Sequence, residues 1–136
     1  MNLDLQSLFD AARAARALAY APYSHFTVGA ALRDAEGAVH AGCNVENAAY
    51  PVGTCAEAGA IAAMVASGGR TIREMLVMGA GPGLVTPCGA CRQRIREFAA
   101  PETVIHVADG DGVLARFTLG ALLPESFGPE NLVRHA

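Results

Sequence analysis

The chain has 136 residues, of which 52% are hydrophobic and 17% charged, so it can form one folded domain, which we expect over residues 1–136. The formal net charge is −3 and the sequence has no basic run, which argues against binding to a nucleic-acid backbone. Charged residues such as Asp10 and Arg13 interrupt the first apolar stretch, so we expect neither a secretory signal nor a membrane span.

The first third of the sequence predicts a helix and a β-hairpin. Apolar residues recur at helical spacing over residues 3–19, and Pro22 should stop this helix. Residues 26–32 are typical of a strand, residues 34–37 of a turn, and residues 38–43 of the returning strand.

The rest of the sequence predicts a loop and then alternating helices and strands. Residues 44–51 have no helical or strand period, and their asparagines could serve turn geometry or bind a ligand. Thr54 is a favourable N-cap for a helix from Cys55 to about residue 66. The later elements are expected at 74–79 (strand), 88–100 (helix), 104–107 and 113–118 (strands) and 119–123 (helix). Strands alternating with helices predict an α/β sheet covered on both faces, and the hairpin makes that sheet mixed.

Three cysteines and a glutamate form the pattern with the clearest chemical meaning. Cys88 and Cys91 are two residues apart at the expected start of one helix, and Cys55 lies at the start of another. Helix N-termini favour thiolates, and thiolates bind zinc. A zinc site with three protein ligands leaves a position for water, and Glu57 can lie beside that water without being a ligand. The pattern therefore predicts metal-assisted hydrolysis.

Other interpretations of the cysteines stay open at this stage. Cys88 and Cys91 could be a redox pair, although Glu57 would then have no role. A structural zinc site would need a fourth ligand, for which the candidates are Cys43, His25, His40 and His106. We interpret Cys43 as a buried strand residue. Four cysteines could form disulfides in a secreted protein, but such spacings more often bind metal in the cytoplasm, where we expect this protein.

Two motifs and three longer segments carry a resemblance to a known family. The motifs are Cys55-Ala56-Glu57 and Pro87-Cys88-Gly89-Ala90-Cys91-Arg92-Gln93, and the segments are residues 23–32, 44–51 and 122–127. Together they span nearly the whole chain, and they resemble the small, homotetrameric, zinc-dependent cytidine deaminases. The resemblance implies a three-layer α/β/α fold with a mixed five-stranded sheet and one Zn²⁺ per subunit. It also implies hydrolytic deamination of cytidine and 2′-deoxycytidine to uridine and 2′-deoxyuridine, in pyrimidine salvage.

The resemblance further implies roles for individual residues. The zinc ligands would be Cys55, Cys88 and Cys91, and Glu57 would carry the proton. The nucleoside would contact Phe26 (packing), Asn44 and Glu46 (ribose 3′-hydroxyl), the Ala56 amide and Thr86 carbonyl (pyrimidine edge), and Phe127 from a neighbouring subunit. These roles imply a homotetramer with shared active sites, a small nucleoside as the partner, and neither nucleic acid nor membrane.

One position departs from the family pattern. The family usually has arginine directly after the glutamate, and this chain has Ala58. Three thiolates outweigh the charge of one zinc ion, and an arginine at that position would draw off the excess negative charge. Arg92 is the nearest cation in the sequence to the ligands, although it could be an ordinary solvated helix residue. We hypothesise that Arg92, or its hydrogen bonds around the ligands, does this work.

Three rival functions are compatible with parts of this pattern. A deaminase of a cytosine-containing nucleoside antibiotic could use the same fold, but Asn44 and Glu46 suit an ordinary sugar. A non-catalytic binding protein stabilised by zinc would release no ammonia. Polynucleotide editing fits less well, because the chain is short and acidic and a site shared within a tetramer leaves little room for a strand.

Overall fold

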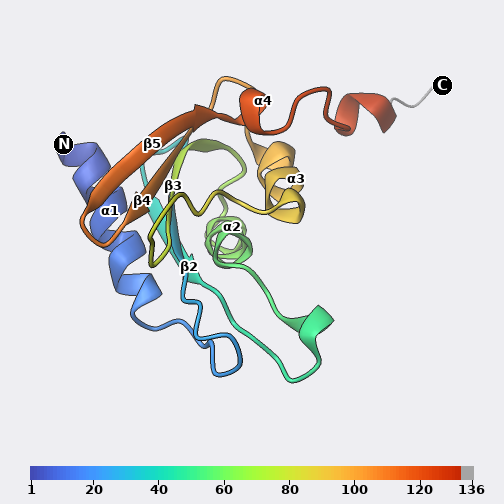
Figure 1. Ribbon diagram of the computed structural model, residues 1–136. Coiled ribbons are helices and arrows are strands. Elements are labelled where there is room, and N and C mark those ends of the chain that lie inside the picture. Colours follow the sequence, from blue (N-terminus) through green and yellow to red (C-terminus); the bar gives the residue numbers. More distant parts are fainter. Residues whose placement is uncertain (133–136) are drawn as a thin grey trace.

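The computed structural model describes residues 1–132 (Figure 1). In chain order the elements are α1 (Leu3–Arg16), β1 (Gly29–Asp34), β2 (Val39–Cys43), the 3-10 turn η1 (Tyr50–Val52), α2 (Ala56–Ala66), β3 (Ile72–Met78), α3 (Gly89–Phe98), β4 (Val104–Asp109), β5 (Gly112–Thr118), α4 (Leu119–Leu122) and η2 (Pro129–Leu132). Among the described residues, no helix combines the length and the apolar character needed to cross a membrane.

A five-stranded sheet in the order β2-β1-β3-β4-β5 forms the middle layer. β1 pairs antiparallel with both β2 and β3, and β4 pairs antiparallel with β5. β3 and β4 are parallel, and α3 makes the crossover between them. The mixed five-stranded sheet expected from the sequence is therefore confirmed.

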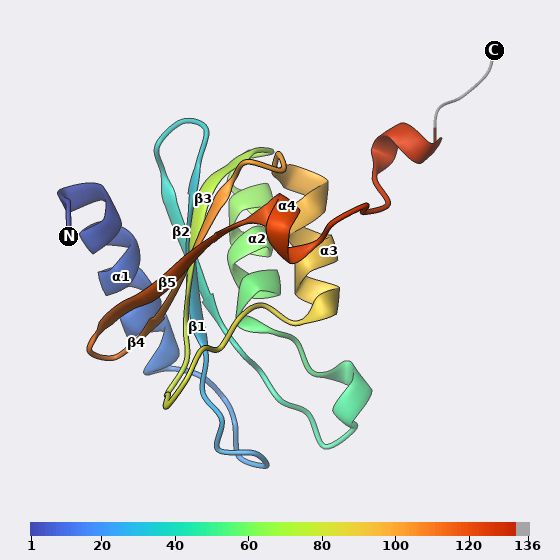
Figure 2. The same ribbon diagram turned by 45° about the horizontal axis from the view of Figure 1, so that its top comes forward.

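Helices cover both faces of this sheet, α1 on one and α2 with α3 on the other (Figure 2). Leu8 of α1 packs with Leu76 of β3 on the first face. Met64 of α2 and Ile95 of α3 pack with Leu32 of β1 on the second. All six residues of β1 are buried because helices lie against both of its faces. The three-layer α/β/α arrangement is confirmed.

The start of α2 lies very close to β2. A Cβ atom built on Gly42 would lie 2.4 Å from the Ala60 nitrogen and 2.7 Å from the Ala56 carbonyl oxygen, so no larger residue fits there. Gly59 of α2 faces Gly42 across the same contact. Because Cys55 directly precedes α2, this contact helps to fix the position of its sulfur.

Several element boundaries differ from those expected from the sequence, and the two largest differences lie before β2. α1 ends at Arg16 rather than at residue 19, and Tyr20 instead pairs with the segment after β2 through a bond from its amide to the Asn44 carbonyl. The first strand begins at Gly29 rather than at residue 26. The Asn44 side chain explains this second difference, because it bonds the Val28 amide and the Phe26 carbonyl that a longer strand would use.

Candidate active site

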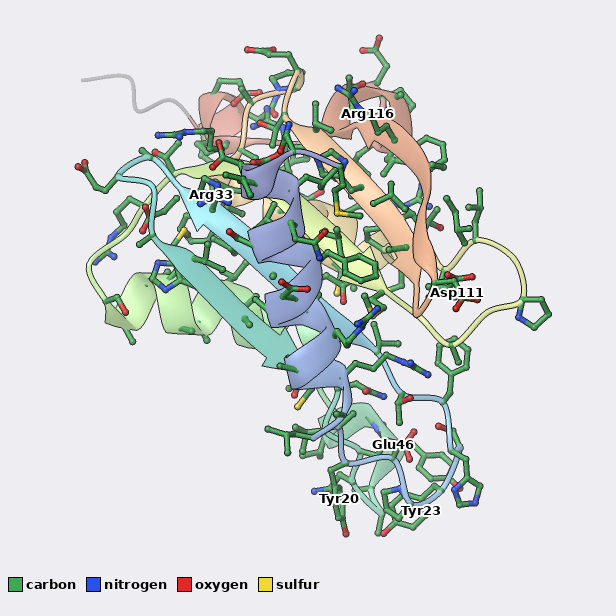
Figure 3. All side chains as sticks on the ribbon, turned by 90° about the vertical axis from the view of Figure 1, so that its left-hand side faces the viewer. Tyr20, Tyr23, Arg33, Glu46, Asp111 and Arg116 are labelled. Carbon is green, nitrogen blue, oxygen red and sulfur yellow. The ribbon has the colours of Figure 1, made fainter. Side chains whose placement is uncertain are left out.

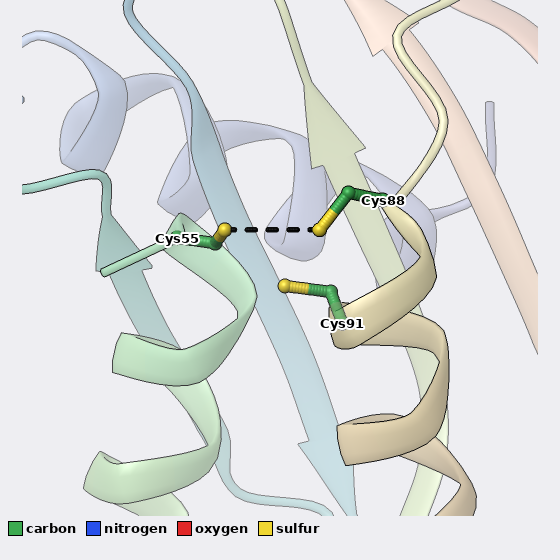
Figure 4. A group of neighbouring side chains, drawn as sticks. All are labelled: Cys55, Cys88 and Cys91. Atoms are coloured by element: carbon green, nitrogen blue, oxygen red, sulfur yellow. Dashed lines mark hydrogen bonds between the residues drawn. The ribbon is translucent and has the colours of Figure 1, made fainter. Parts of the chain in front are cut away.

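Three cysteine side chains meet where α2 and α3 begin (Figure 4). The sulfur atoms of Cys55, Cys88 and Cys91 all lie within 4.8 Å of one another, and those of Cys55 and Cys88 are 3.9 Å apart. Within residues 1–132 no other group of three or more cysteine, histidine or carboxylate ligand atoms lies so close together. The fold therefore gathers three sulfur donors from two separate helices.

Two of these cysteines are the N-cap residues of their helices. Cys55 precedes α2 and Cys88 precedes α3, both with extended backbones, while Cys91 lies in the first turn of α3. The sequence prediction of Thr54 as the N-cap of α2 is wrong by one residue, because Thr54 still pairs with Val45 through two backbone hydrogen bonds. The sulfurs thus lie beside first-turn amides, which have no acceptor within the helix.

The local environment acts differently on the three thiols. Burial raises the pKa of Cys55, and burial together with the charge of Glu57 raises the pKa of Cys91. Burial also acts to raise the pKa of Cys88, but hydrogen bonds, chiefly from the backbone and thiol of Cys91, outweigh it and lower that pKa. Cys55 and Cys91 therefore hold their protons more strongly than a free cysteine, and Cys88 holds its proton less strongly. Binding of a metal cation displaces such protons from the thiols. Three sulfur donors, with no fourth ligand in range among residues 1–132, match tetrahedral zinc with one position left for water.

The Glu57 carboxyl lies in the first turn of α2, two residues after the first cysteine. The residue is 4% exposed and lines a cavity beside the cysteines. Burial raises the pKa of this carboxyl, although hydrogen bonds from its own amide and from the Cys91 thiol oppose the rise. A carboxyl whose pKa is raised is suited to accept a proton and to release it again.

A cavity of about 530 Å³ opens next to the three sulfurs, a volume that suits a small organic molecule. Its walls come from the segment before β1, the loop after β2, the start of α2 and the turn before α3. Six residues were expected from the sequence to contact a substrate, and five of them line this cavity, namely Phe26, Asn44, Glu46, Ala56 and Thr86. The sixth, Phe127, is not among the lining residues; it is 58% exposed, and its carbonyl accepts a bond of 2.9 Å from Gln93 Nε2.

The carboxylate of Glu46 is anchored by the segment that carries Phe26. It accepts hydrogen bonds from the amides of Tyr23 (3.0 Å) and Ser24 (3.1 Å) and from the Ser24 hydroxyl. Ser24 Oγ in turn accepts a bond of 3.0 Å from the Phe26 amide. Figure 3 shows Tyr23 and Glu46 at the same end of the molecule. The Ser24 hydroxyl is the main cause that lowers the pKa of Glu46, so this carboxylate is ionised at neutral pH.

Asn44 bridges the loop after β2 and the segment before β1. Its Oδ1 accepts a bond of 2.9 Å from the Val28 amide, and its Nδ2 donates one of 2.7 Å to the Phe26 carbonyl. The side chain therefore does more than shape its own turn. One N–H of the amide group and one lone pair of its oxygen are left over for a ligand in the cavity.

The arginine beside a sulfur is not the one expected from the sequence. Arg92 donates to three oxygens, those of the Pro87 carbonyl (2.7 Å), the Leu122 carbonyl (2.8 Å) and the Thr86 hydroxyl (3.1 Å). Arg94 Nη1 instead lies 3.5 Å from Cys91 Sγ. Arg92 therefore bonds oxygens around the ligands and no sulfur, and the hypothesis that it offsets the thiolate charge stays a prediction. Helical spacing could have identified Arg94 as the arginine beside the Cys91 sulfur, because residues three apart share a helix face and adjacent residues do not.

The remaining candidate ligands lie elsewhere or have other partners. His40 Nε2 is 2.8 Å from Asp34 Oδ2, and His106 Nε2 is 3.1 Å from Glu74 Oε2. Cys43 on β2 is half-buried and, like His25, is not part of the sulfur cluster in the described chain. A closed site with four protein ligands therefore finds no support in this geometry.

Comparisons with known proteins agree on one family. The sequence model described as the cytidine and deoxycytidylate deaminase zinc-binding region matches residues 3–107. The chain is 39% identical over 130 residues to the cytidine deaminase of Sporosarcina psychrophila, covering 96% of each chain. It is 37% identical over 133 residues to that of Mycobacterium tuberculosis, covering 98% of this chain and 96% of the relative.

A solved structure is similar over nearly the same length. The cytidine deaminase from Burkholderia pseudomallei superposes with a TM-score of 0.86 at 42% identity, covering 93% of this chain and 100% of the other. The likeness in fold therefore covers most of this chain.

Proposed function

The chain belongs to the cytidine and deoxycytidylate deaminase family, and from that premise we propose that it hydrolyses cytidine and 2′-deoxycytidine to uridine and 2′-deoxyuridine with release of ammonia. One observation carries the proposal, namely that Cys55, Cys88 and the buried Glu57 line a single cavity of nucleoside size, with the Cys91 sulfur within 4.8 Å of the other two sulfurs. The products would enter pyrimidine salvage. Because thiolate ligands need reducing conditions, we place the reaction in the cytoplasm.

The proposed metal ligands are Cys55, Cys88 and Cys91, which suit one zinc ion per chain. Zinc, when bound, supplies the Lewis acidity that makes water a nucleophile at neutral pH. The protein contributes the fixed positions of the three sulfurs, which both helix starts hold before the substrate arrives.

Glu57 is proposed to move every proton of the reaction. It accepts a proton from the attacking water and delivers it to N3 of the cytosine, which makes C4 electrophilic. After oxygen has added to C4, Glu57 removes the hydroxyl proton and passes it to the amine. The C4–N bond then breaks, ammonia leaves, and the C4 carbonyl of the uracil ring remains. One carboxyl suffices because the transfers follow one another at one place.

The substrate is proposed to lie with its base toward Glu57 and its sugar toward the loop after β2. Phe26 would pack on the nucleoside, and the Ala56 amide and Thr86 carbonyl would read the pyrimidine edge. Asn44 and Glu46 would bond the ribose 3′-hydroxyl. Support comes from the cavity, which all five residues line, and from the remaining hydrogen-bonding capacity of Asn44.

We also propose a homotetramer in which Phe127 completes the site of a neighbouring subunit. Exposed apolar side chains gather at the cavity, among them Tyr23, Phe26 and Tyr50, and such a patch favours a protein partner. The segment after α4, which carries Phe127, extends away from the body in both ribbon views (Figures 1 and 2). That direction favours contact with a second chain.

The test is to incubate purified protein with cytidine and to follow ultraviolet loss, ammonia and zinc content together. We expect about one zinc per chain and stoichiometric ammonia. The variants Cys55→Ala, Cys88→Ala and Cys91→Ala should each lose zinc and activity, whereas the matched control Cys43→Ala should keep both.

Two results would overturn this assignment. Bound zinc without ammonia release would indicate a non-catalytic binding protein, and faster turnover of blasticidin S than of cytidine would indicate an antibiotic deaminase. Loss of zinc in Cys43→Ala would instead indicate a structural site with four cysteines.

A further inference from the structure

Arg94 reaches the sulfur cluster from α3. It follows Cys91 by three residues, so both side chains lie on the face of α3 that borders α2, the face that Figure 4 shows for Cys91. Its Nη1 atom lies 3.5 Å from Cys91 Sγ, within range for a hydrogen bond to sulfur.

The charge at this place is unbalanced when zinc is bound. Three neutral thiols give up their protons to zinc, so the centre changes from no charge to a net formal charge of −1. Within residues 1–132, Arg94 is the one arginine that donates to a sulfur of the cluster, because the donors of Arg92 are bonded to oxygens.

We propose that Arg94 is a positioning residue of the metal centre: its guanidinium hydrogen-bonds the Cys91 sulfur and offsets the negative charge that zinc binding creates. This role rests on the proposed zinc ligands and is independent of which nucleoside is deaminated. Arg94 acts on the ligand sulfur and not on the substrate. Because the cation favours the more negative zinc-bound state over the protonated thiols, removing it weakens zinc binding at neutral pH.

The test compares zinc binding in the wild type with that in Arg94→Met, Arg94→Lys and Arg116→Met, in the absence of substrate. Arg116 is an exposed residue of β5 that pairs with His106, on the sheet face opposite α2 and α3 (Figure 3). The Arg116→Met variant therefore removes the same charge far from the cluster. Zinc affinity is measured by competition with a chelator. In protein loaded with Co²⁺, the thiolate-to-metal charge-transfer band reports the electron density on the sulfurs.

Arg94→Met should bind zinc at least about tenfold more weakly, within the 10–100-fold range typical of groups that support metal ligands. Its charge-transfer band should move to longer wavelength, because sulfur that loses a charged donor releases electrons more easily. Arg94→Lys should recover part of both changes, and Arg116→Met should match the wild type. An Arg94→Met variant with wild-type affinity and band position would overturn the proposal, as would a lysine variant no better than methionine. If the wild type did not deaminate cytidine, the proposed function would be refuted. The zinc measurements would still test the role of Arg94, because they need no substrate.

Discussion

At the scale of single residues, the proposed reaction depends on one carboxyl, that of Glu57, which is buried. Glu57 lies in the first turn of α2 beside Cys55, so a helix anchored to the sheet sets its position relative to the sulfurs. An acid held in this way can serve successive proton transfers without moving. Its role can be separated from metal binding, because Glu57 is not part of the ligand cluster.

Replacing Glu57 by glutamine should abolish most of the activity and keep the metal. Glutamine has a similar shape but cannot accept and release the proton, so kcat should fall by about 10²–10⁴. Steady-state kinetics and metal analysis on the same preparation check this. A variant with near-normal kcat would exclude the proton-carrying role, and a variant without zinc would show that Glu57 supports the metal.

Ser24 should control how well the sugar is held, since it ties Glu46 to the backbone of Phe26. A site that bonds a hydroxyl rejects ligands without one, so native enzyme should strongly prefer 2′-deoxycytidine to 2′,3′-dideoxycytidine. Glu46→Ala should narrow this preference in kcat/KM, and Ser24→Ala should narrow it less. Equal kcat/KM for both nucleosides in the native enzyme would remove the sugar-binding role.

The sequence predicted correctly that the three cysteines and Glu57 lie at one site, because their spacing is tied to helix starts that the sequence also marks. It could not assign Ser24, since its partner Glu46 lies 22 residues away and the two meet only through the loops of the fold. The sequence did not identify Arg94, because Arg92 lies nearer to the ligands along the chain, whereas Arg94 shares the helix face of Cys91.

At the scale of elements, the β1–β2 hairpin is closed by one side chain. Asp34 Oδ1 accepts bonds from the amides of Glu36 (2.9 Å) and Ala38 (3.0 Å), and Oδ2 lies 2.8 Å from His40 Nε2. The bond to His40 is the main cause that lowers the pKa of Asp34 below its ordinary value of 3.8. The ionised carboxylate therefore stabilises the folded hairpin.

Asp34→Asn should lower the melting temperature by several degrees at neutral pH, because asparagine keeps the turn acceptor and loses the charge. The pKa of Asp34 is lower in the folded state than in the unfolded state, so the carboxylate stabilises the fold at pH values above its ordinary pKa of 3.8. This stability is lost as the pH falls through the lowered pKa of the folded state. The difference from the wild type should therefore shrink in acid. Thermal unfolding of both proteins at several pH values tests this. The control variant is Glu36→Gln, which removes the charge of an exposed residue in the same turn. If the difference in melting temperature between Asp34→Asn and the wild type did not change with pH, the effect would come from packing and not from the charge.

Element types followed from the periodicity of the sequence, whereas their ends depended on contacts with distant segments. The strand over residues 104–109 and the helix that follows Cys88 agree with the expected types because apolar spacing and caps are local. The first strand begins after the expected residue because the Asn44 side chain bonds the backbone of Val28 and Phe26. Helix α2 begins after the expected residue because Thr54 pairs with Val45. Neither of these contacts between distant segments can be predicted from a short stretch of sequence.

At the scale of the whole molecule, a shared active site can be tested by mixing two defective chains. Phe127→Ala should raise KM at least about fivefold, the factor that 1 kcal/mol represents, and Glu57→Gln should be nearly inactive. In mixed oligomers, a chain that retains Glu57 can receive Phe127 from its neighbour. Co-refolded mixtures should therefore show a lower KM than Phe127→Ala alone.

The control for this mixture is Leu114→Ala, which removes an exposed apolar residue from β5 and should leave KM unchanged. Sedimentation of each preparation reports its assembly. A mixture that behaves as the simple average of its components, or a fully active monomer, would contradict the shared site.

The position of the sulfurs on two helices also determines how the chain responds to loss of its metal. Cys55 and Cys88 are 33 residues apart, and closing a loop of that length in an unfolded chain costs roughly 4 kcal/mol of entropy by the relation for cross-links. Here α2 and α3 also pack against the sheet through apolar residues such as Met64 and Ile95, so contacts other than the metal hold this loop closed. A chelator should therefore lower the melting temperature but leave a folded chain. Zinc added back should restore that temperature within the mixing time, unlike in small zinc domains that must refold around their ion.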